Sequence, residues 1–367
     1  MQFAEHNAPE ERDFLCNAWY VAAWSTELPP GEVIGRQIIG EPIACFRSPD
    51  GRVHALEDRC PHRHAPLSLG RIEGEHLRCM YHGLKFSADG ACVEVPGNDR
   101  IPPNSCARTY PCEERHGWIW VWPGDVEQAD PSFIPAAYGL DPLRYSLMSS
   151  QLDYEANYQL INDNLCDLSH VDFVHERTLG VGAFGWADAQ PKITTLDRSI
   201  RVERWLNGIT DPADPQPCEY WNSYEFHIPG IFVMSSFLYP VGSAERFGGV
   251  APNLLEAKGH RVEQQAVTPI DQKRTRYFFA SGLEAVNVPE EIMSRFFDVI
   301  EAAFAEDRRM IEAQQRIWDL TSTDRRKMFI AHDKAPSIIR RLIARLIDKE
   351  RATEMSTTRS PVRELSR

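Results

Sequence analysis

The stretch "CPHRHAPLSLGRIEGEHLRCMYHG", residues 60–83, decides how the first part of the chain folds. It holds two cysteines and four histidines in 24 residues. Four of these six side chains form two similar pairs, Cys60-x-His62 and, after a gap of sixteen residues, Cys79-x2-His82. His64 and His76 fall outside the pairs, and we expect them at the surface or beside the site. The pattern predicts one site that receives a thiolate and an imidazole from each of two loops.

A cluster of two irons explains why each loop carries one residue of each kind. A Cys2His2 zinc finger instead places both cysteines in one half and both histidines in the other. In the iron cluster, Cys60 and Cys79 hold one iron, and His62 and His82 hold the other. Neutral imidazoles in place of two thiolates raise the reduction potential, which suits a centre that accepts and passes on electrons. A structural zinc site with the same four ligands is the alternative.

Composition and charge limit the class of protein. A chain of 367 residues favours two domains, and 43% hydrophobic with 25% charged residues is typical of a globular protein. The net charge of −13 argues against a nucleic-acid-binding protein. No apolar run is long enough for a membrane span, and the N-terminus lacks the layout of a signal peptide. We therefore expect a soluble, cytoplasmic protein whose nine cysteines are reduced.

The secondary-structure signals predict an α+β protein. Residues 15–125 read as short strands, with Asp-Gly turns inside 42–57 and 83–97 that are typical of hairpins. We place the domain boundary near 128, which gives an all-β domain over 1–128 and a second domain over 129–367. In the second domain we expect an antiparallel sheet flanked by helices. The expected segments are a helical segment over 145–180, strands over 190–285 with a loop at 211–217, helices over 289–318 and 336–349, and a mobile tail from about 352.

A second group of polar residues lies within the predicted helical segment 145–180. Its pattern is Asn164-x2-Asp167-x2-His170-x4-His175. Residues three apart lie near one another on a helix. His170 and His175 are five apart, about 140° around a regular helix, so we expect the helix to end or distort between them. Two histidines and one carboxylate on one face of a metal are the ligands of non-haem Fe(II) oxygenases.

The carboxylate is predicted from the helix at 289–318. Its apolar stripe comprises Met293, Phe296, Ile300, Phe304 and Ile311. Asp307 lies about 20° from Ile300 on this stripe, whereas the other acids, Asp298, Glu301, Glu306 and Glu312, lie about 100° or more away. A buried carboxylate needs a cation, which is either iron or a buried arginine or lysine.

Both motifs together resemble the Rieske non-haem iron oxygenases, most closely the group of vanillate and dicamba O-demethylases. The resemblance extends to "NAWYVAAW" (17–24), "YHGLKF" (81–86), "WIWVWPGD" (118–125) and "NYQLINDNLCDLSHVDFVH" (157–175). It implies that Cys60, His62, Cys79 and His82 hold a Rieske [2Fe–2S] cluster and that His170, His175 and Asp307 hold a mononuclear Fe(II). It also makes Asp167 the acid that bridges His82 of one subunit to His170 of its neighbour, with Asn164 near the iron.

The resemblance implies a terminal oxygenase component that uses O2 to oxygenate an aromatic or related small molecule. The chain lacks G-x-G-x-x-G after a strand, so its electrons come from a partner, a ferredoxin or an NAD(P)H-dependent reductase. Monooxygenation, as O- or N-demethylation or hydroxylation, is favoured over cis-dihydroxylation of a ring. A Rieske electron carrier without oxygenase activity is the alternative of another class, and it needs only the first 125 or so residues.

The family also implies a homotrimer that brings one subunit's cluster beside the next subunit's iron. A positive excess near the cluster could dock an acidic ferredoxin or be ordinary solvated charge; it comprises Arg59, Arg63, Arg71, Arg78 and Lys85. The resemblance does not identify the substrate. Candidates for its pocket are Asn222, Tyr224, His227 and Phe232, and strand alternation does not choose among them.

Overall fold

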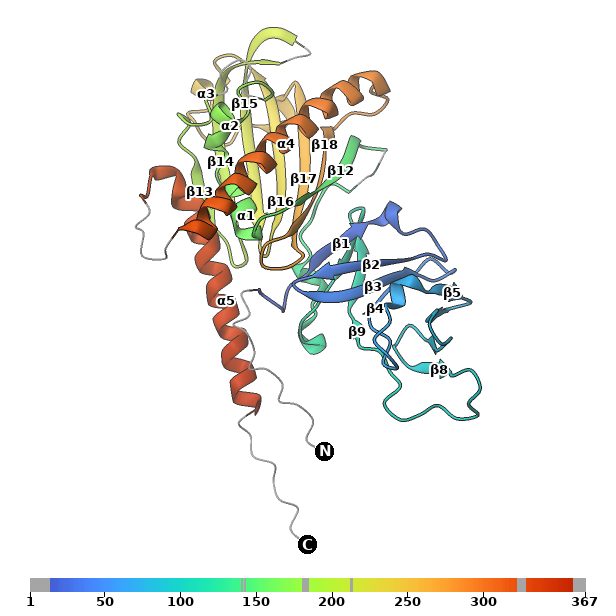
Figure 1. Ribbon diagram of the computed structural model, residues 1–367. Coiled ribbons are helices and arrows are strands. Elements are labelled where there is room, and N and C mark those ends of the chain that lie inside the picture. The colour runs from blue at the N-terminus through green and yellow to red at the C-terminus, as the bar shows by residue number, and fades with distance from the viewer. Residues whose placement is uncertain are drawn as a thin grey trace.

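The computed structural model describes residues 14–139, 141, 143–179, 185–211, 214–321 and 328–358. An N-terminal region of small β-sheets is followed by a larger antiparallel sheet with helices against it (Figure 1). This arrangement confirms the predicted α+β class. Of the helices in these ranges, none is both long and apolar enough to cross a membrane.

Three small sheets build the N-terminal region. One has the order β1 (Tyr20–Trp24), β11 (Trp118–Val121), β10 (Cys112–Arg115). The next has the order β2 (Val33–Ile38), β3 (Glu41–Arg47), β4 (Val53–Glu57), β9 (Thr109–Tyr110). The third has the order β5 (Arg71–Glu73), β6 (His76–Arg78), β7 (Lys85–Phe86), β8 (Cys92–Glu94). Strand pairs β3–β4 and β7–β8 confirm the two predicted Asp-Gly hairpins.

The second region is built on a seven-stranded antiparallel sheet of order β12-β18-β17-β16-β15-β14-β13. Its strands are β12 (Ser146–Tyr154), β13 (Lys192–Thr195), β14 (Ser199–Asp211), β15 (Asp214–His227), β16 (Ile231–Pro240), β17 (Gly259–Pro269) and β18 (Thr275–Leu283). The long helix α4 (Glu290–Leu320) lies across one face of this sheet (Figure 1). Helix α1 (Tyr158–Cys166) contacts β17, and helix α5 (Lys334–Thr358) contacts α1 and β14.

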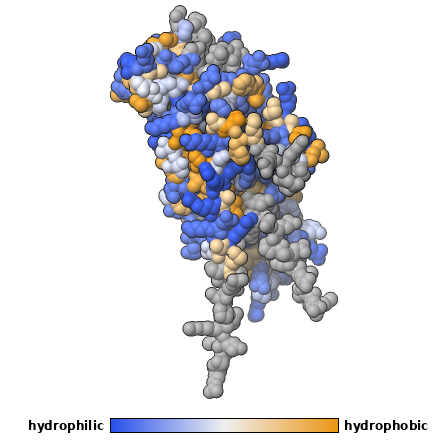
Figure 2. All heavy atoms as spheres, turned by 90° about the vertical axis from the view of Figure 1, so that its left-hand side faces the viewer, coloured by the Kyte–Doolittle hydropathy of each residue, from blue (hydrophilic) through white to orange (hydrophobic). Residues whose placement is uncertain are grey.

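Short helices connect these elements. They are η1 (Ser25–Glu27), η2 (Leu67–Leu69), η3 (Val126–Gln128), η4 (Pro131–Phe133), η5 (Leu168–His170), α2 (Val171–Val174), α3 (Ser243–Arg246), η6 (Leu254–Glu256) and η7 (Ala331–Asp333). On the side that carries α5, the surface mixes hydrophilic side chains with small apolar patches (Figure 2).

Three predicted boundaries are wrong. Residues 146–154 form β12 rather than helix, because they pair with β18 over nine positions at the sheet edge. The predicted loop at 211–217 is shorter, since β14 runs to Asp211 and β15 begins at Asp214. Helix α5 continues past 349 to Thr358, so residues 352–358 are helical. The rest of the predicted mobile tail, 359–367, lies outside the described residues.

A cluster of tryptophans joins the two regions. Trp24 of β1 packs edge-on against Phe278 of β18, with ring centroids 6.1 Å apart. Trp19, Trp118, Trp120 and Trp122 belong to the same buried cluster, together with Ile231 of β16. The indole N–H of Trp24 also donates to the carbonyl of Ser150 in β12. Burial of such large side chains fixes the N-terminal region against the sheet.

Candidate active site

Two similar loops place the Cys/His pairs at the tip of the N-terminal region. In the first, the Cys60 N–H donates to the Ala65 carbonyl at 2.8 Å, and in the second, the Cys79 N–H donates to the Leu84 carbonyl at 2.8 Å. Gly83 closes the second loop with a φ of +78°, a backbone conformation that favours glycine. The two loops thus present their ligands in equivalent ways.

The two cysteines lie beside each other, and so do the two histidines. Both cysteines are buried, whereas His62 and His82 are exposed with ring centroids 4.5 Å apart. Burial raises the pKa of the Cys60 thiol to about 11, so a metal must displace its proton. Desolvation and the neighbouring His62 and Arg63 lower the pKa of His82, which favours the neutral imidazole that a ligand requires. Two buried thiols behind two exposed imidazoles fit a Rieske cluster.

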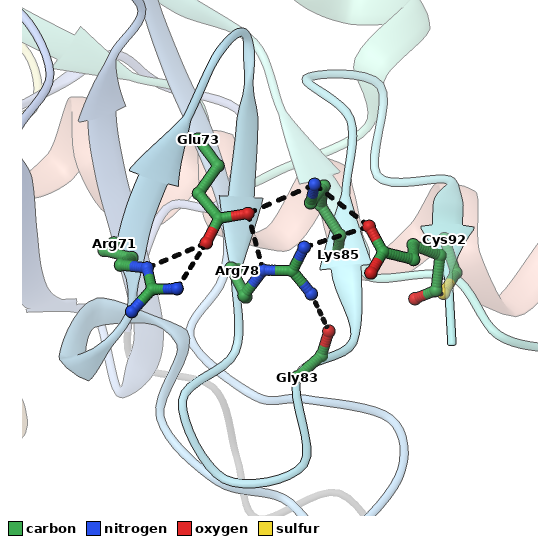
Figure 3. Close-up of polar contacts among 7 residues, drawn as sticks. Arg71, Glu73, Arg78, Gly83, Lys85 and Cys92 are labelled. Carbon is green, nitrogen blue, oxygen red and sulfur yellow. Dashed lines mark hydrogen bonds and ion pairs between the residues drawn. The ribbon is translucent and has the colours of Figure 1, made fainter. Parts of the chain in front are cut away.

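An ion-pair network holds the second loop (Figure 3). The Arg78 guanidinium donates to the Gly83 carbonyl at 2.5 Å, to Glu73 at 2.7 Å and to Glu94 at 2.9 Å. Lys85 pairs with the same two glutamates at 3.1 and 3.0 Å. Because Arg78 directly precedes Cys79, these contacts fix both ends of the loop that carries Cys79 and His82.

The same network bears on the predicted excess of basic side chains near the cluster. Arg59, Arg71, Arg78 and Lys85 all pair with glutamates, namely Glu57, Glu73 and Glu94. Of the five basic residues, only Arg63 lacks an ion pair with any residue that the structure describes. Most of this charge is therefore neutralised locally.

The segment with the second motif is not one continuous helix. Helix α1 ends at Cys166, and Asp167 then caps η5 by accepting the Ser169 N–H at 2.9 Å. An aspartate favours such a break because its side chain competes for backbone N–H groups. Helix α2 ends at Val174, so His175 lies beyond it. The expected break between His170 and His175 is confirmed, and the earlier break at Asp167 was not predicted.

Helix α4 brings Asp307 to both histidines. As the periodicity predicts, Asp307 is buried, with 4% of its surface exposed. Its carboxylate lies 3.2 Å from Nε2 of His175 and 3.6 Å from Nε2 of His170. The three ligand atoms all lie within 4.8 Å of one another. Two imidazole nitrogens and a carboxylate oxygen at this separation fit an Fe(II) site with open positions.

The contacts of Asp307 decide between the two cations considered for it. Its partners among the described residues are His170, His175 and the amide of Asn164, which donates to Oδ1 at 3.0 Å. None of these is an arginine or a lysine. Burial disfavours the charged form of His175, yet Asp307 and Glu306 outweigh this and raise its pKa. The side chains around Asp307 therefore favour a bound cation.

Asn164 and Asp167 contact the metal-binding group differently from each other. The Asn164 amide lies between Asp307 and Nε2 of His170, 3.2 Å from the latter. Nδ1 of His170 donates to the backbone carbonyl of Asp167 at 2.6 Å. The Asp167 carboxylate caps η5 instead. Within one chain, Asp167 therefore contacts His170 through its backbone oxygen, and the bridge to His82 of a neighbouring subunit stays a prediction.

Glu306 is the residue that the periodicity argument misplaced. It precedes Asp307 on α4, and the 100° count assigned it to the outside of the helix. Its carboxylate is half-buried, lies 3.0 Å from Nδ1 of His175 and accepts the Thr178 hydroxyl at 2.7 Å. The signal that could have found it is that a metal-binding histidine usually donates its second N–H to a carboxylate or carbonyl.

A cavity of about 130 Å³ opens beside the three ligand residues. Most of its wall is apolar, contributed by Leu165, Leu168, Val171, Leu179, Trp186, Leu206, Phe232, Met234, Phe296, Ile300 and Phe304. Of the four pocket candidates, Phe232 lines it. Asn222 donates to Ser236, Tyr224 donates to the Cys166 carbonyl, and His227 pairs with Glu225, so these three have structural partners.

Comparisons with known proteins agree with both sites. Residues 18–111 match the Rieske [2Fe-2S] domain family, and residues 154–349 match the vanillate O-demethylase oxygenase C-terminal domain family. The chain is therefore an oxygenase component of the Rieske non-haem iron oxygenase class, an oxidoreductase with a [2Fe–2S] cluster and a mononuclear iron. Within that class, it belongs to the family of the vanillate and dicamba O-demethylases.

Several relatives align over almost their whole length. The iron-sulfur subunit of the toluene-4-sulfonate monooxygenase system of Comamonas testosteroni is 35% identical, with 92% of this chain and 98% of that protein covered. The vanillate O-demethylase oxygenase subunit of a Pseudomonas species is 32% identical, with 92% and 96% covered. The crystal structure of dicamba monooxygenase bound to dicamba matches with a TM-score of 0.80 and 30% identity, over 92% and 99% of the chains. As an oxygenase component, the chain takes electrons from a partner protein and acts on a small molecule.

Proposed function

We propose that this protein is the terminal oxygenase of a multicomponent monooxygenase acting on an aromatic substrate. In this proposal His170, His175 and Asp307 bind the mononuclear iron, and Cys60, His62, Cys79 and His82 bind the cluster. The observation that carries it is the convergence of two imidazoles and a buried carboxylate on a largely apolar cavity. The names of relatives, which include vanillate, dicamba and toluene-4-sulfonate as aromatic compounds, support the aromatic class.

The iron, when bound with open positions, supplies the activation of O2. The chain's own residues prepare the site for it. Asn164 holds the Asp307 carboxylate by a hydrogen bond, and the apolar wall excludes water from the substrate. The overall reaction consumes one substrate, one O2, two electrons and two protons, and it yields the oxygenated product and one water. Where the substrate carries a methyl ether, hydroxylation of the methyl group leads to release of formaldehyde.

A homotrimer is the assembly that we propose for electron transfer. Within one chain, the β5–β8 region with the cluster loops lies at the opposite end of the molecule from α2 (Figure 1). Beside the exposed His82, the cluster loops present Met80 and Tyr81, exposed by 50% and 60%. Phe173 of α2 is 73% exposed next to the iron ligands. Burying these apolar side chains between neighbouring subunits would bring His82 near Asp167 of the next chain.

The electron donor is proposed to be a ferredoxin, an NAD(P)H-dependent reductase, or both in sequence. A cytoplasmic location agrees with the nine cysteines, none of which forms a disulfide. We keep the division into domains 1–128 and 129–367, because η3 ends the N-terminal region at Gln128.

The decisive experiment combines the purified protein with a surrogate reductase and NADH, and it follows O2 uptake and product mass over a panel of aromatic methyl ethers and methylarenes. We expect O2 uptake that depends on substrate, with products one oxygen heavier or with formaldehyde. A cis-diol product would support ring dihydroxylation instead. Reduction of the cluster without substrate-dependent O2 uptake across the panel would favour a Rieske electron carrier.

A further inference from the structure

A buried arginine of the large sheet stands out because no carboxylate among the described residues forms an ion pair with it. Arg204 belongs to β14, and only 5% of its surface is exposed. Its guanidinium carbon lies 5.3 Å from the ring centroid of Trp186 and 5.8 Å from that of Tyr224. Burial of a charge is costly unless other groups compensate for it, so the surroundings of Arg204 should explain its position.

Two hydrogen bonds in series join Arg204 to the end of helix α1. Nη2 of Arg204 donates to the Tyr224 hydroxyl at 3.4 Å, and this hydroxyl donates to the Cys166 carbonyl at 2.8 Å. The sheet register supports the first contact, because Tyr224 pairs with Val202, two positions from Arg204 and on the same face. Cys166 is the last residue of α1. The series therefore ends on the peptide group that leads into Asp167.

The electrostatics of this helix end compensate for the buried charge. The last carbonyls of a helix carry partial negative charge, which a cation stabilises. Burial lowers the pKa of Arg204, whereas Tyr224 and Asp167 act in the opposite direction and favour the charged guanidinium. An arginine stays protonated in proteins, so Arg204 is a fixed positive charge behind the end of α1.

The segment after Cys166 carries groups that belong to the iron site. The Asp167 carbonyl accepts the hydrogen bond from Nδ1 of His170 at 2.6 Å, and the Asp167 carboxylate caps η5. A rotation of the peptide between Cys166 and Asp167 would move both groups. We propose that Arg204 is a positioning residue for Asp167, and that it acts through Tyr224 and the Cys166 carbonyl. This inference rests on the proposed function for the part that Asp167 plays in electron transfer between subunits.

Three variants separate the components of this series. Tyr224→Phe removes the hydroxyl and keeps the ring, Arg204→Met removes the charge, and Arg204→Lys keeps a positive charge. The matched control is Arg201→Met, because Arg201 also lies on β14 but forms a partly exposed ion pair with Glu225. The visible spectrum and the iron content of each holoenzyme show that the variant is folded and carries both metal centres.

The first measurement needs no turnover. It is the EPR spectrum of the anaerobic holoenzyme with nitric oxide as a probe of the mononuclear Fe(II) site, because the line shape reports the orientation of the histidine ligands. The partner of the second ring nitrogen fixes that orientation. We expect Tyr224→Phe and Arg204→Met to change the line shape, Arg204→Lys to restore part of it, and Arg201→Met to match the wild type.

The second measurement is stopped-flow oxidation of the reduced cluster with O2 and the methyl ether or methylarene that gives the fastest O2 uptake in the wild type. Tyr224→Phe and Arg204→Met should each slow this oxidation by roughly 10-fold or more, since a misplacement of about 1 Å has effects of this size. The double variant should be no slower than the slower single variant, because both residues act in one series.

The inference is overturned if Tyr224→Phe matches the wild type in either measurement, or if Arg201→Met has the same effects. It is also overturned if Arg204→Met changes only the dissociation constant of the substrate, because Arg204 would then support Trp186 in the cavity wall and no more. Failure of the proposed function has a different signature, which is a wild type that binds nitric oxide and oxidises its cluster but forms no oxygenated product.

Discussion

Glu306 and His175 form a pair that extends the metal-binding group outward. The Glu306 carboxylate lies 3.0 Å from Nδ1 of His175, and Nε2 of the same ring faces Asp307 at 3.2 Å. A carboxylate that accepts a hydrogen bond from the Nδ1–H group leaves Nε2 unprotonated as the ligand atom and makes that nitrogen more basic. The Thr178 hydroxyl donates to the same Glu306 oxygen and fixes its position.

Replacement of Glu306 with glutamine should weaken iron binding without removing the cluster. Loss of such a carboxylate partner lowers metal affinity by roughly 10- to 100-fold. The measurement is a titration of the iron-depleted mononuclear site with Fe(II), in Glu306→Gln and in Glu301→Gln as a control. Glu301 is exposed on the same helix and should have no effect. An unchanged affinity in Glu306→Gln would show that the pair does not position His175.

Replacement of Asp167 with asparagine should stop turnover while both metal centres remain. Asparagine caps a helix as well as aspartate does, so η5 and the carbonyl that contacts His170 should persist. The negative charge proposed to meet His82 of the neighbouring subunit is lost. Stopped-flow oxidation of the reduced cluster in the presence of substrate and O2 should become much slower, and wild-type rates would refute the bridge.

Replacement of Arg78 with glutamine should loosen the loop that carries Cys79 and His82. The variant loses the contacts to Gly83, Glu73 and Glu94 that join both ends of this loop. Heating should then bleach the visible cluster absorbance at a lower temperature than in the wild type. Arg71→Gln is the control, because Arg71 pairs with Glu73 alone among the described residues and lies away from the loop (Figure 3). Equal bleaching temperatures for the two variants would contradict this role.

The stability of the iron-free protein should depend on pH through the raised pKa of His175. A group whose pKa is raised on folding stabilises the fold fully below its unfolded pKa, about 6.5 for histidine. This stability is lost as the pH rises through the raised folded value, and Fe(II) binds more tightly over the same range because it displaces the proton. Thermal unfolding of iron-free protein at several pH values from 6 upward should show this loss, and Asp307→Asn should reduce it. The same slope in both proteins would assign it to other groups.

Sequence reasoning identified residues that lie close together in the chain or that recur with the period of a helix. The two Cys/His pairs sit in short loops, so spacing alone identifies them, and the apolar stripe of α4 identifies Asp307. The break at Asp167 was missed because a capping side chain decides it within one turn. Glu306 was missed because its partner, His175, is distant in sequence. Strand β12 was misread because its pairing with β18 overrides local preference.

The iron and acid-labile sulfide content of the wild type and of Asp307→Ala tests the mononuclear site most directly. We predict about three irons and two sulfides per wild-type chain, from one [2Fe–2S] cluster and one mononuclear site. Asp307→Ala should keep about two irons, both sulfides and the cluster spectrum, and should lose O2-dependent turnover. A wild type with only two irons when isolated and after Fe(II) loading, or an Asp307→Ala variant that retains the third iron, would contradict the assignment of the mononuclear site to Asp307, His170 and His175.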